Sequence, residues 1–313
     1  MSSKLTALLE KKGLLIVDGA MGTMLQRAGL SMGECPELWN IEHAACVQKI
    51  HEDYLNAGAD IIVTNTFGGS PKKLKMFGLQ DRTAEINRAG AELAARARSA
   101  CEGRESALVC GSVGPTGELL APLGTATPES MLEQFAVQIR ALVQGGVDAI
   151  IVETMICPEE ALLAAKAARS VLKSLPVVVN LTYEPTPHGP RTMMGTSPES
   201  FMRMLADRNV SIDGVGTNCG TGANDMVAVV DALRKCCTRM PIVAYPNAGM
   251  PRMQAAVPAL NYAAFTAVYD ESPAEFAQKA ARLVDAGASI VGGCCGTTPA
   301  HINQLSRRLS NIG

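Results

Sequence analysis

Eight short apolar runs recur along this chain of 313 residues and limit the folds that it can adopt. Valine and isoleucine are frequent in these runs, and glycine or polar residues end each of them. Near-continuous apolar character is typical of parallel strands whose two faces are both buried. The expected strands span residues 14–18, 60–65, 107–112, 149–153, 177–182, 214–219, 242–247 and 289–294.

A helical pattern follows each apolar run. Four of these patterns start with a hydroxyl residue before proline, the preferred order of N-cap and first helical position. The four pairs are Thr127-Pro128, Ser197-Pro198, Ser272-Pro273 and Thr298-Pro299. The expected helices span residues 42–56, 83–101, 128–144, 158–172, 198–208, 224–236, 273–285 and 299–309.

Eight strand–helix units in one chain of this length predict a single-domain α/β fold, the (β/α)8 TIM barrel. An open doubly wound sheet is the alternative, but the first strand-to-helix turn lacks its G-x-G-x-x-G fingerprint. We expect residues 1–12 to be an N-terminal extension and residues 13–313 to form the barrel. The longest irregular stretches, 184–195 and 249–271, follow strands and should lie on the catalytic face.

The composition of the chain argues against some classes of binding partner. The formal net charge is -2 and aromatic residues make up only 4% of the chain, which disfavours nucleic acid. No apolar run approaches the roughly 20 residues of a membrane helix. The polar start of the chain lacks a signal peptide pattern, so a cytoplasmic protein without membrane contact is expected. Ten cysteines are too few for a disulfide scaffold of this size.

Polar residues at the expected strand ends are candidates for chemistry, because active sites of barrels form there. They are Asp18, Asn65, Ser112, Glu153, Asn180, Asn218, Cys219, Asn247, Cys294 and Cys295. Cys219 ends the sixth strand, and the adjacent pair Cys294-Cys295 ends the eighth. Three thiolates from one rim can bind zinc with a fourth position open. The residues alone leave open two alternatives: cysteines packed in a crowded loop, or a glycine-rich phosphate site.

Other reactive side chains carry less information. Cys236-Cys237 ends a helix away from the catalytic face and is assigned no role. His43, His51 and His301 lie in helical patterns and are interpreted as solvated, whereas His188 in the fifth loop is a candidate substrate contact. The chain has neither an H-E-x-x-H nor a G-x-S-x-G motif, which disfavours hydrolytic zinc and serine chemistry.

Seven motifs in this order resemble the homocysteine S-methyltransferase family. They are Asp18–Met24 (DGAMGTM), Thr64–Gly68 (TNTFG), 111–117 (GSVGPTG), Glu153-Thr154, Asn218-Cys219, 246–249 (PNAG) and 293–299 (GCCGTTP). The resemblance covers residues 13–309 and implies the same barrel. It also implies zinc-dependent transfer of a methyl group to the zinc-bound thiolate of homocysteine, which gives methionine.

The resemblance assigns roles to individual residues. It implies that Cys219, Cys294 and Cys295 bind zinc and that Asp18 and Glu153 lie near the homocysteine ammonium. It further implies that the turn from Gly19 through Ala20 to Thr23 receives the substrate carboxylate. Asn65 is a further candidate substrate contact, and Asn247 can approach the metal when no thiol is bound.

The methyl donor is left open by the sequence. Met24 stands where many family members have glutamate, and this form is closer to the homocysteine module of cobalamin-dependent methionine synthases. A methylated corrinoid protein, an S-methylsulfonium compound and a betaine are all compatible donors, and another thiol could be the acceptor. The alternatives are a subunit that turns over only with a separate corrinoid protein and a phosphate-binding aldolase-like or isomerase-like barrel. No lysine ends a strand to form a Schiff base, which counts against the aldolase.

Overall fold

The predicted apolar runs form eight parallel strands around a barrel. The structure is a computed structural model that describes residues 3–255 and 265–310. The barrel strands are β1 (Leu15–Ile16), β2 (Ile61–Val63), β3 (Leu108–Val113), β4 (Ala149–Met155), β5 (Val177–Leu181), β6 (Gly214–Gly222), β7 (Ile242–Asn247) and β10 (Ile290–Val291). Their order is β1-β10-β7-β6-β5-β4-β3-β2, and a bridge between Val17 and Ile61 closes the circle. The predicted (β/α)8 fold is therefore confirmed.

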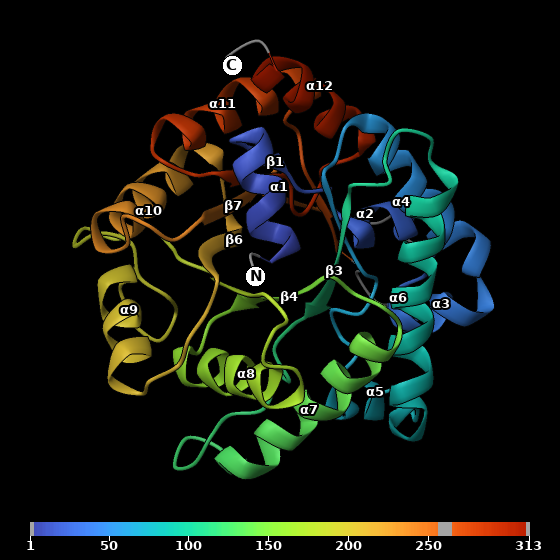
Figure 1. Ribbon diagram of the computed structural model, residues 1–313, viewed down its shortest axis with the longest axis vertical. Coiled ribbons are helices and arrows are strands. Elements are labelled where there is room, and N and C mark those ends of the chain that lie inside the picture. Colours follow the sequence, from blue (N-terminus) through green and yellow to red (C-terminus); the bar gives the residue numbers. More distant parts are fainter. Residues whose placement is uncertain (1–2, 256–264, 311–313) are drawn as a thin grey trace.

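Helices surround the barrel (Figure 1). They are α1 (Lys4–Lys12), α2 (Met21–Arg27), α3 (Trp39–Glu42), α4 (Ala44–Ala57), α5 (Pro71–Lys75), α6 (Thr83–Ala100), α7 (Pro128–Gln144), α8 (Pro158–Val171), α9 (Pro198–Asp207), α10 (Ala223–Cys236), α11 (Pro273–Asp285) and α12 (Pro299–Ser310), with 3-10 turns Pro36–Leu38 and Gln80–Arg82. All eight predicted helices are present within two residues of their expected ends. The sequence interpretation missed α1, α2, α3 and α5.

Capping explains why the predicted helix starts are accurate. The side chains of Thr127, Ser197 and Ser272 each accept a hydrogen bond from the backbone N–H three residues later. Ser272 and Glu275 form the capping box that their spacing predicts. Gly58 adopts a left-handed conformation (φ 111°) just past α4, where an L side chain would be strained.

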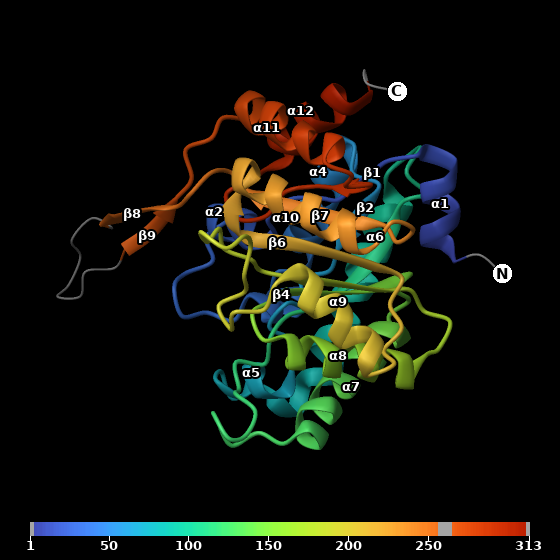
Figure 2. The same ribbon diagram turned by 90° about the vertical axis from the view of Figure 1, so that its left-hand side faces the viewer.

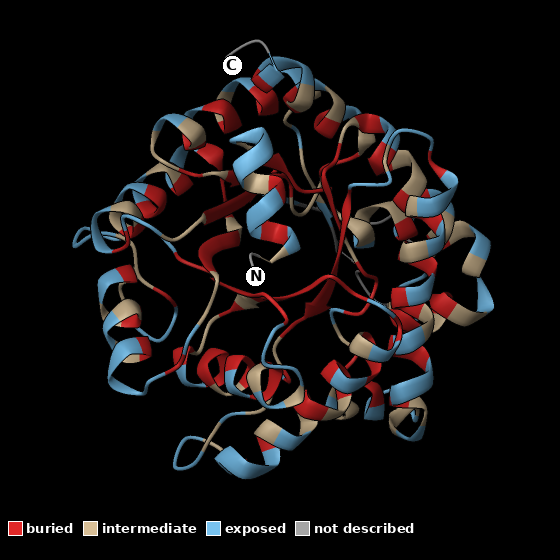
Figure 3. Cartoon of the chain, viewed as in Figure 1, coloured by how far each residue is buried: buried red, intermediate tan, exposed pale blue. Residues whose placement is uncertain are grey.

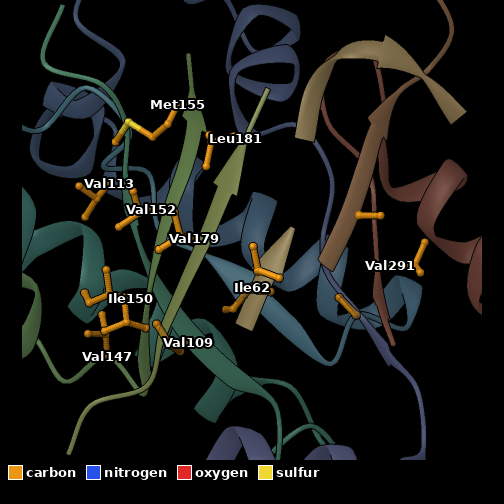
Figure 4. Packing of buried hydrophobic residues seen from close by; sticks show 14 of the residues in the cluster. Ile62, Val109, Val113, Val147, Ile150, Val152, Met155, Val179, Leu181 and Val291 are labelled. Carbon is orange, nitrogen blue, oxygen red and sulfur yellow. The ribbon is translucent and has the colours of Figure 1, made fainter. Parts of the chain in front are cut away.

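The strands divide the core into two parts. Successive residues of a strand point in opposite directions. Those that point outward pack against the helices (Figure 4), and those that point inward fill the barrel. Ile62, Val109 and Val179 belong to the outer cluster, while Ile61 and Val178 belong to the inner one. Helix residues that face the barrel are mostly buried, and those on the outer side of the helix ring are mostly exposed (Figure 3).

Helix α1 lies across one end of the barrel (Figure 1). Its buried Leu5 and Leu8 belong to the same cluster as Leu15, Val178 and other barrel-filling residues. Lys12 and Lys4 form ion pairs with Asp60 and Asp148, which lie at the starts of strands. The segment expected to be an extension therefore covers the barrel end opposite the strand C-termini.

Leu5→Ala is expected to lower the free energy of unfolding by about 2–5 kcal/mol, because it leaves a cavity at the barrel end. Urea denaturation measures the change. Lys11→Ala on the exposed face of the same helix is the control, with an expected change below about 0.5 kcal/mol. Equal effects of the two substitutions would show that α1 does not contribute to the core.

A second sheet corrects the expectation for the described part of the stretch 249–271, whose residues 256–264 lie outside the described residues. Strands β8 (Arg252–Ala255) and β9 (Phe265–Val268) form an antiparallel ribbon rather than irregular loop. The ribbon projects from the barrel at the end opposite α1 (Figure 2). The stretch 184–195 contains one antiparallel bridge, between Glu184 and Arg191, and its His188 is exposed.

Among the described residues, no helix is both long and apolar enough to cross a membrane.

The interpretation of two histidines as solvated was wrong. His51 is fully buried in α4, and burial lowers its pKa to about 4, so that it is neutral. His301 is also buried, and its Nε2 lies 3.0 Å from the carbonyl oxygen of Glu271. His51 lies on α4 and His301 on α12, and these two helices pack against each other. His43 is exposed, as expected.

Candidate metal and substrate site

Three cysteine sulfurs converge at the C-terminal rim of the barrel. The Sγ atoms of Cys219, Cys294 and Cys295 all lie within 4.8 Å of one another. Those of Cys219 and Cys295 are 3.8 Å apart. Cys219 lies on β6, and the adjacent pair follows β10, so β7 separates the two ligand strands as predicted. Cys236 and Cys237 lie at the end of α10, and neither belongs to this group.

The backbone conformation around the three cysteines orients their side chains. Cys219 has φ 59°, a left-handed conformation that a non-glycine residue holds only when its surroundings enforce it. Gly293 lies against Thr297, where a Cβ would come within 2.5 Å of the Thr297 hydroxyl. Gly296 has φ 82°, and a Cβ at this position would come within 2.4 Å of the Tyr269 side chain. The glycines around the cysteine pair are therefore required for close packing.

The three thiols act electrostatically as one group. Contacts with the Cys219 and Cys294 thiols hold the pKa of Cys295 well below that of an ordinary thiol, and the Tyr269 hydroxyl contributes in the same direction. Interactions with Cys219 and Cys295 raise the pKa of Cys294. One thiolate stabilised by neighbouring thiols is ready to accept a soft cation.

Glu153 on β4 is held by two hydroxyl donors. Its Oε1 accepts a hydrogen bond from Ser112 of β3. Its Oε2 accepts one of 2.8 Å from Tyr245 of β7, whose own hydroxyl accepts a bond from Asn180. Burial raises the pKa of Glu153 despite these bonds. The network fixes a carboxylate inside the barrel mouth without supplying a neutralising charge.

Asp18 provides a second carboxylate, at the end of β1. Its Oδ2 accepts a 2.8 Å hydrogen bond from the N–H of Val63. Burial raises its pKa well above the usual value, and the neighbouring Glu153 charge adds to this rise. Among the described residues, no lysine, arginine or histidine forms an ion pair with either carboxylate. Two buried acids without a cation suit a ligand that carries a positive charge.

A cavity of about 420 Å³ joins the carboxylates to the sulfurs. Its lining comes from segments that follow several different strands. The members that argue for function are Asp18, Gly19, Ala20, Thr23, Glu37, Asn65, Phe67, Ser112, Glu153, Cys219, Tyr245, Cys294 and Cys295. Most residues of the predicted site therefore meet in one cavity, whereas Asn180, Asn218, Asn247 and His188 are absent from its lining.

The turn from Gly19 to Thr23 borders this cavity and begins α2. The N–H of Ala20 donates a 3.1 Å hydrogen bond to the Thr297 hydroxyl, so this N–H already has a partner. The first intrahelical bond runs from Met24 to the carbonyl of Ala20. The N–H groups of Met21, Gly22 and Thr23 thus have no intrahelical partner and are available to an anion.

Asn65 and Asn247 differ from the other predicted residues. The Asn65 amide donates to the carbonyl of Pro36 at 2.7 Å and to Asn40 at 3.1 Å, so it ties two loops together. Asn247 ends β7, between the two ligand strands, and its Oδ1 is buried without a partner in the described part of the chain. The neighbouring Ala248 N–H donates to the carbonyl of Cys295 at 2.9 Å.

Tyr245 and Glu37 line this cavity, and sequence reasoning missed both. Tyr245 lies two positions before Asn247 in an apolar run, and that alternation could have placed it on the inward face. Glu37 lies between α2 and α3, far from any strand end, and no sequence signal marked it. Glu37 accepts a 2.6 Å hydrogen bond from the Gly68 N–H, and burial raises its pKa.

Comparison with known proteins identifies the family of this chain. The homocysteine S-methyltransferase family profile matches residues 15–309. Methionine synthase from Mycobacterium tuberculosis is 33% identical over 96% of this chain and 25% of its own length. That from Mycobacterium leprae is 32% identical over 94% of this chain and 24% of its own length. The chain spans about a quarter of the length of these relatives.

Solved structures of one protein superpose on nearly the whole chain. The metallated form of the homocysteine methyltransferase MmuM from Escherichia coli superposes with a TM-score of 0.78 and 26% identity. The superposition covers 98% of this chain and 100% of the MmuM chain. The oxidized form of the same protein has a TM-score of 0.78 and 25% identity, with the same coverage. With a family match that extends over nearly its full length, the chain belongs to the homocysteine S-methyltransferase family.

Proposed function

We propose that this protein is a zinc-dependent homocysteine S-methyltransferase that produces methionine. The observation that carries the proposal is the group of three cysteine sulfurs in the same cavity as two uncompensated carboxylates. One end of the cavity suits a soft metal and a thiol, and the other suits an ammonium group. Homocysteine carries both groups on a short chain.

The cysteine group fits zinc. Two sulfurs bound to one zinc at about 2.3 Å in tetrahedral geometry lie about 3.8 Å apart. The sulfurs of Cys219 and Cys295 have this separation, 3.8 Å. Three protein ligands leave one tetrahedral position for a substrate. Zinc held there would supply the positive charge that keeps the substrate thiol deprotonated, and therefore nucleophilic, at neutral pH.

The remaining residues would orient the substrate. Asp18 and Glu153 bind the ammonium group, and the free N–H groups at the start of α2 receive the carboxylate. Tyr245 and Ser112 keep Glu153 in place through the bonds described above. Homocysteine fixed at both ends presents its sulfur toward the cavity mouth, where an incoming methyl group can be attacked in line.

A second candidate function is methyl transfer that requires a partner protein. Among the described residues, nine of the ten exposed large apolar side chains lie on segments between a barrel strand and the helix that follows it on the barrel wall, and one of the nine, Phe67, lines the cavity. They are Met32, Phe67, Met76, Phe77, Leu119, Leu123, Met193, Met194 and Met250, whereas Leu172 lies elsewhere. Flexible exposed methionines are typical of protein-binding surfaces. The relatives named methionine synthase are about four times as long as the matched segment, which is compatible with delivery of the methyl group by another protein domain.

A donor screen separates the two functions. Zinc-loaded protein and homocysteine are incubated with an S-methylsulfonium compound, a betaine or a methylated corrinoid protein, and methionine is measured by mass spectrometry. Turnover with a small donor alone supports the first function, and turnover only with the corrinoid protein supports the second. Failure to methylate homocysteine with all three donors, by protein that binds zinc, would contradict both.

Gly19→Ala is expected to weaken homocysteine binding, because the new Cβ would lie 2.7 Å from the Thr297 hydroxyl and 2.8 Å from the Tyr54 ring. The overpacking should also cost about 1–3 kcal/mol of stability. Isothermal titration and thermal unfolding measure the two effects. Gly22→Ala in the same turn is the control for stability, since its Cβ would meet no atom within 4 Å. A stable Gly19→Ala variant with unchanged homocysteine affinity would argue against the carboxylate role of this turn.

A further inference from the structure

The side chain of Asn218 connects three strands at the rim. Asn218 precedes Cys219 on β6 and is fully buried. Its Nδ2 lies 3.8 Å from the Sγ of Cys294, which follows β10. The same amide forms two bonds with Thr154 of β4: Oδ1 accepts from the Thr154 N–H at 2.8 Å, and Nδ2 donates to the Thr154 hydroxyl at 2.7 Å. One amide therefore joins a cysteine of the metal group to the residue after Glu153.

The backbone around this amide is held in unusual conformations. Thr154 and Cys219, the residues on the two sides of the contact, have φ values of 58° and 59°. The third non-glycine residue with positive φ in the described chain, Asn209, lies outside this cluster. The Thr182 hydroxyl also donates to the carbonyl of Asn218 at 3.0 Å. Strained backbone of this kind persists where the surroundings fix it, and it is concentrated at functional sites.

We propose that Asn218 is a positioning residue that donates an N–H to the Cys294 sulfur and thereby holds and partly neutralises this ligand. The proposal rests on the proposed function, since it concerns the zinc site. Three cysteinates place three negative charges around one divalent ion, so a polar N–H directed at one sulfur reduces the charge that this sulfur donates. Hydrogen bonds to ligand sulfurs are a recognised means of adjusting a metal centre.

The position of the amide adds a second effect. Because Asn218 also binds Thr154, a shift of the Cys294 sulfur is transmitted to β4, where Glu153 binds the substrate ammonium in the proposed function. The metal end and the ammonium end of homocysteine are thus kept at a fixed separation by one side chain. The zinc affinity and the KM for homocysteine should both depend on Asn218.

Asn218→Asp tests the contact with the smallest change of shape. The carboxylate can still accept hydrogen bonds from the N–H and hydroxyl of Thr154, but it places an anion where the N–H faced the sulfur. Zinc affinity, measured by competition with a chromophoric chelator, is expected to fall about 10- to 100-fold. In protein loaded with cobalt(II), the thiolate-to-cobalt charge-transfer band is expected to shift.

Thr154→Val is the matched control. It removes the hydroxyl that accepts from Nδ2 but leaves the contact between Nδ2 and the Cys294 sulfur, so the wild-type charge-transfer band is expected. If Asn218→Asp does not fold, Asn218→Ser removes the amide without adding charge and should also shift the band and weaken zinc binding.

The outcomes are distinct. Wild-type zinc affinity and band in a folded Asn218 variant would overturn the inference while leaving the proposed function intact. Wild-type protein that does not bind zinc at all would refute the proposed function itself. A shift in both Asn218→Asp and Thr154→Val would assign the effect to the tie between β4 and β6 rather than to the sulfur contact, and would also overturn the inference.

Discussion

Cys295→Ser is expected to lower the zinc affinity of this protein by about 100- to 1,000-fold and to abolish methylation of homocysteine. Structural zinc sites are worth about 10–16 kcal/mol, so one of four ligands accounts for roughly 2.5–4 kcal/mol. The loss should be large because Cys295 supplies one of the three sulfurs that lie within 4.8 Å of one another. Metal content by mass spectrometry and methionine formation are measured on the same sample.

Cys236→Ser is the control for this experiment. Cys236 is exposed at the end of α10 and lies outside the sulfur group, so both zinc content and turnover should match the wild type. Thermal unfolding of the metal-free proteins shows whether either substitution damages the fold. A folded Cys295→Ser variant that retains full methyl transfer without zinc would rule out the proposed role of the metal.

Asp18→Asn is expected to have opposite effects on binding and on stability. Loss of a charged hydrogen bond to the ammonium group costs about 1.5–3 kcal/mol, so the Kd for homocysteine should rise about 10- to 100-fold. The asparagine can still accept the N–H of Val63, so the loop should keep its position. 4-Mercaptobutyrate, which lacks the ammonium group, should bind wild type and variant about equally.

The stability effect follows from the raised pKa of Asp18. The folded protein holds the Asp18 proton more tightly than the unfolded chain, in which the pKa is about 3.9. The contribution of this carboxyl group to stability is therefore complete below about pH 4 and is lost as pH rises through the folded-state pKa. Without substrate, Asp18→Asn should melt at a higher temperature than wild type at neutral pH, and the difference should vanish toward pH 4. A lower melting temperature at neutral pH would contradict this account.

Most of the fold could be predicted because its signals are local. The periodicity of α7 and α11, together with their Thr-Pro and Ser-Pro starts, determines both helices to the residue. Helix α1 was missed because a helix of 9 residues depends on packing rather than on its own propensity. The burial of Leu5 and Leu8 becomes evident only when the open end of the barrel is known.

The candidate site was predictable where its residues end strands. Asp18, Glu153 and the three cysteines meet because parallel strands bring their C-termini to one rim. Glu37 was missed since it reaches the cavity through a loop that bonds to Gly68. The buried state of His51 could not be predicted either, because its burial depends on how α4 packs against neighbouring helices. The role of zinc and the roles of all the site residues, including Asn65 and Asn247, are still predictions.

The position of β10 between β7 and β1 has a consequence for biosynthesis. Cys295 is 76 residues from Cys219 along the chain, and the adjacent Cys294 and Cys295 follow β10, the last barrel strand of the described residues. A growing chain can present Cys219 early but cannot complete the sulfur group until β10 inserts and closes the barrel. If the group binds zinc as proposed, metal loading would report that the barrel has closed, and chains truncated before β10 would be unable to retain the metal.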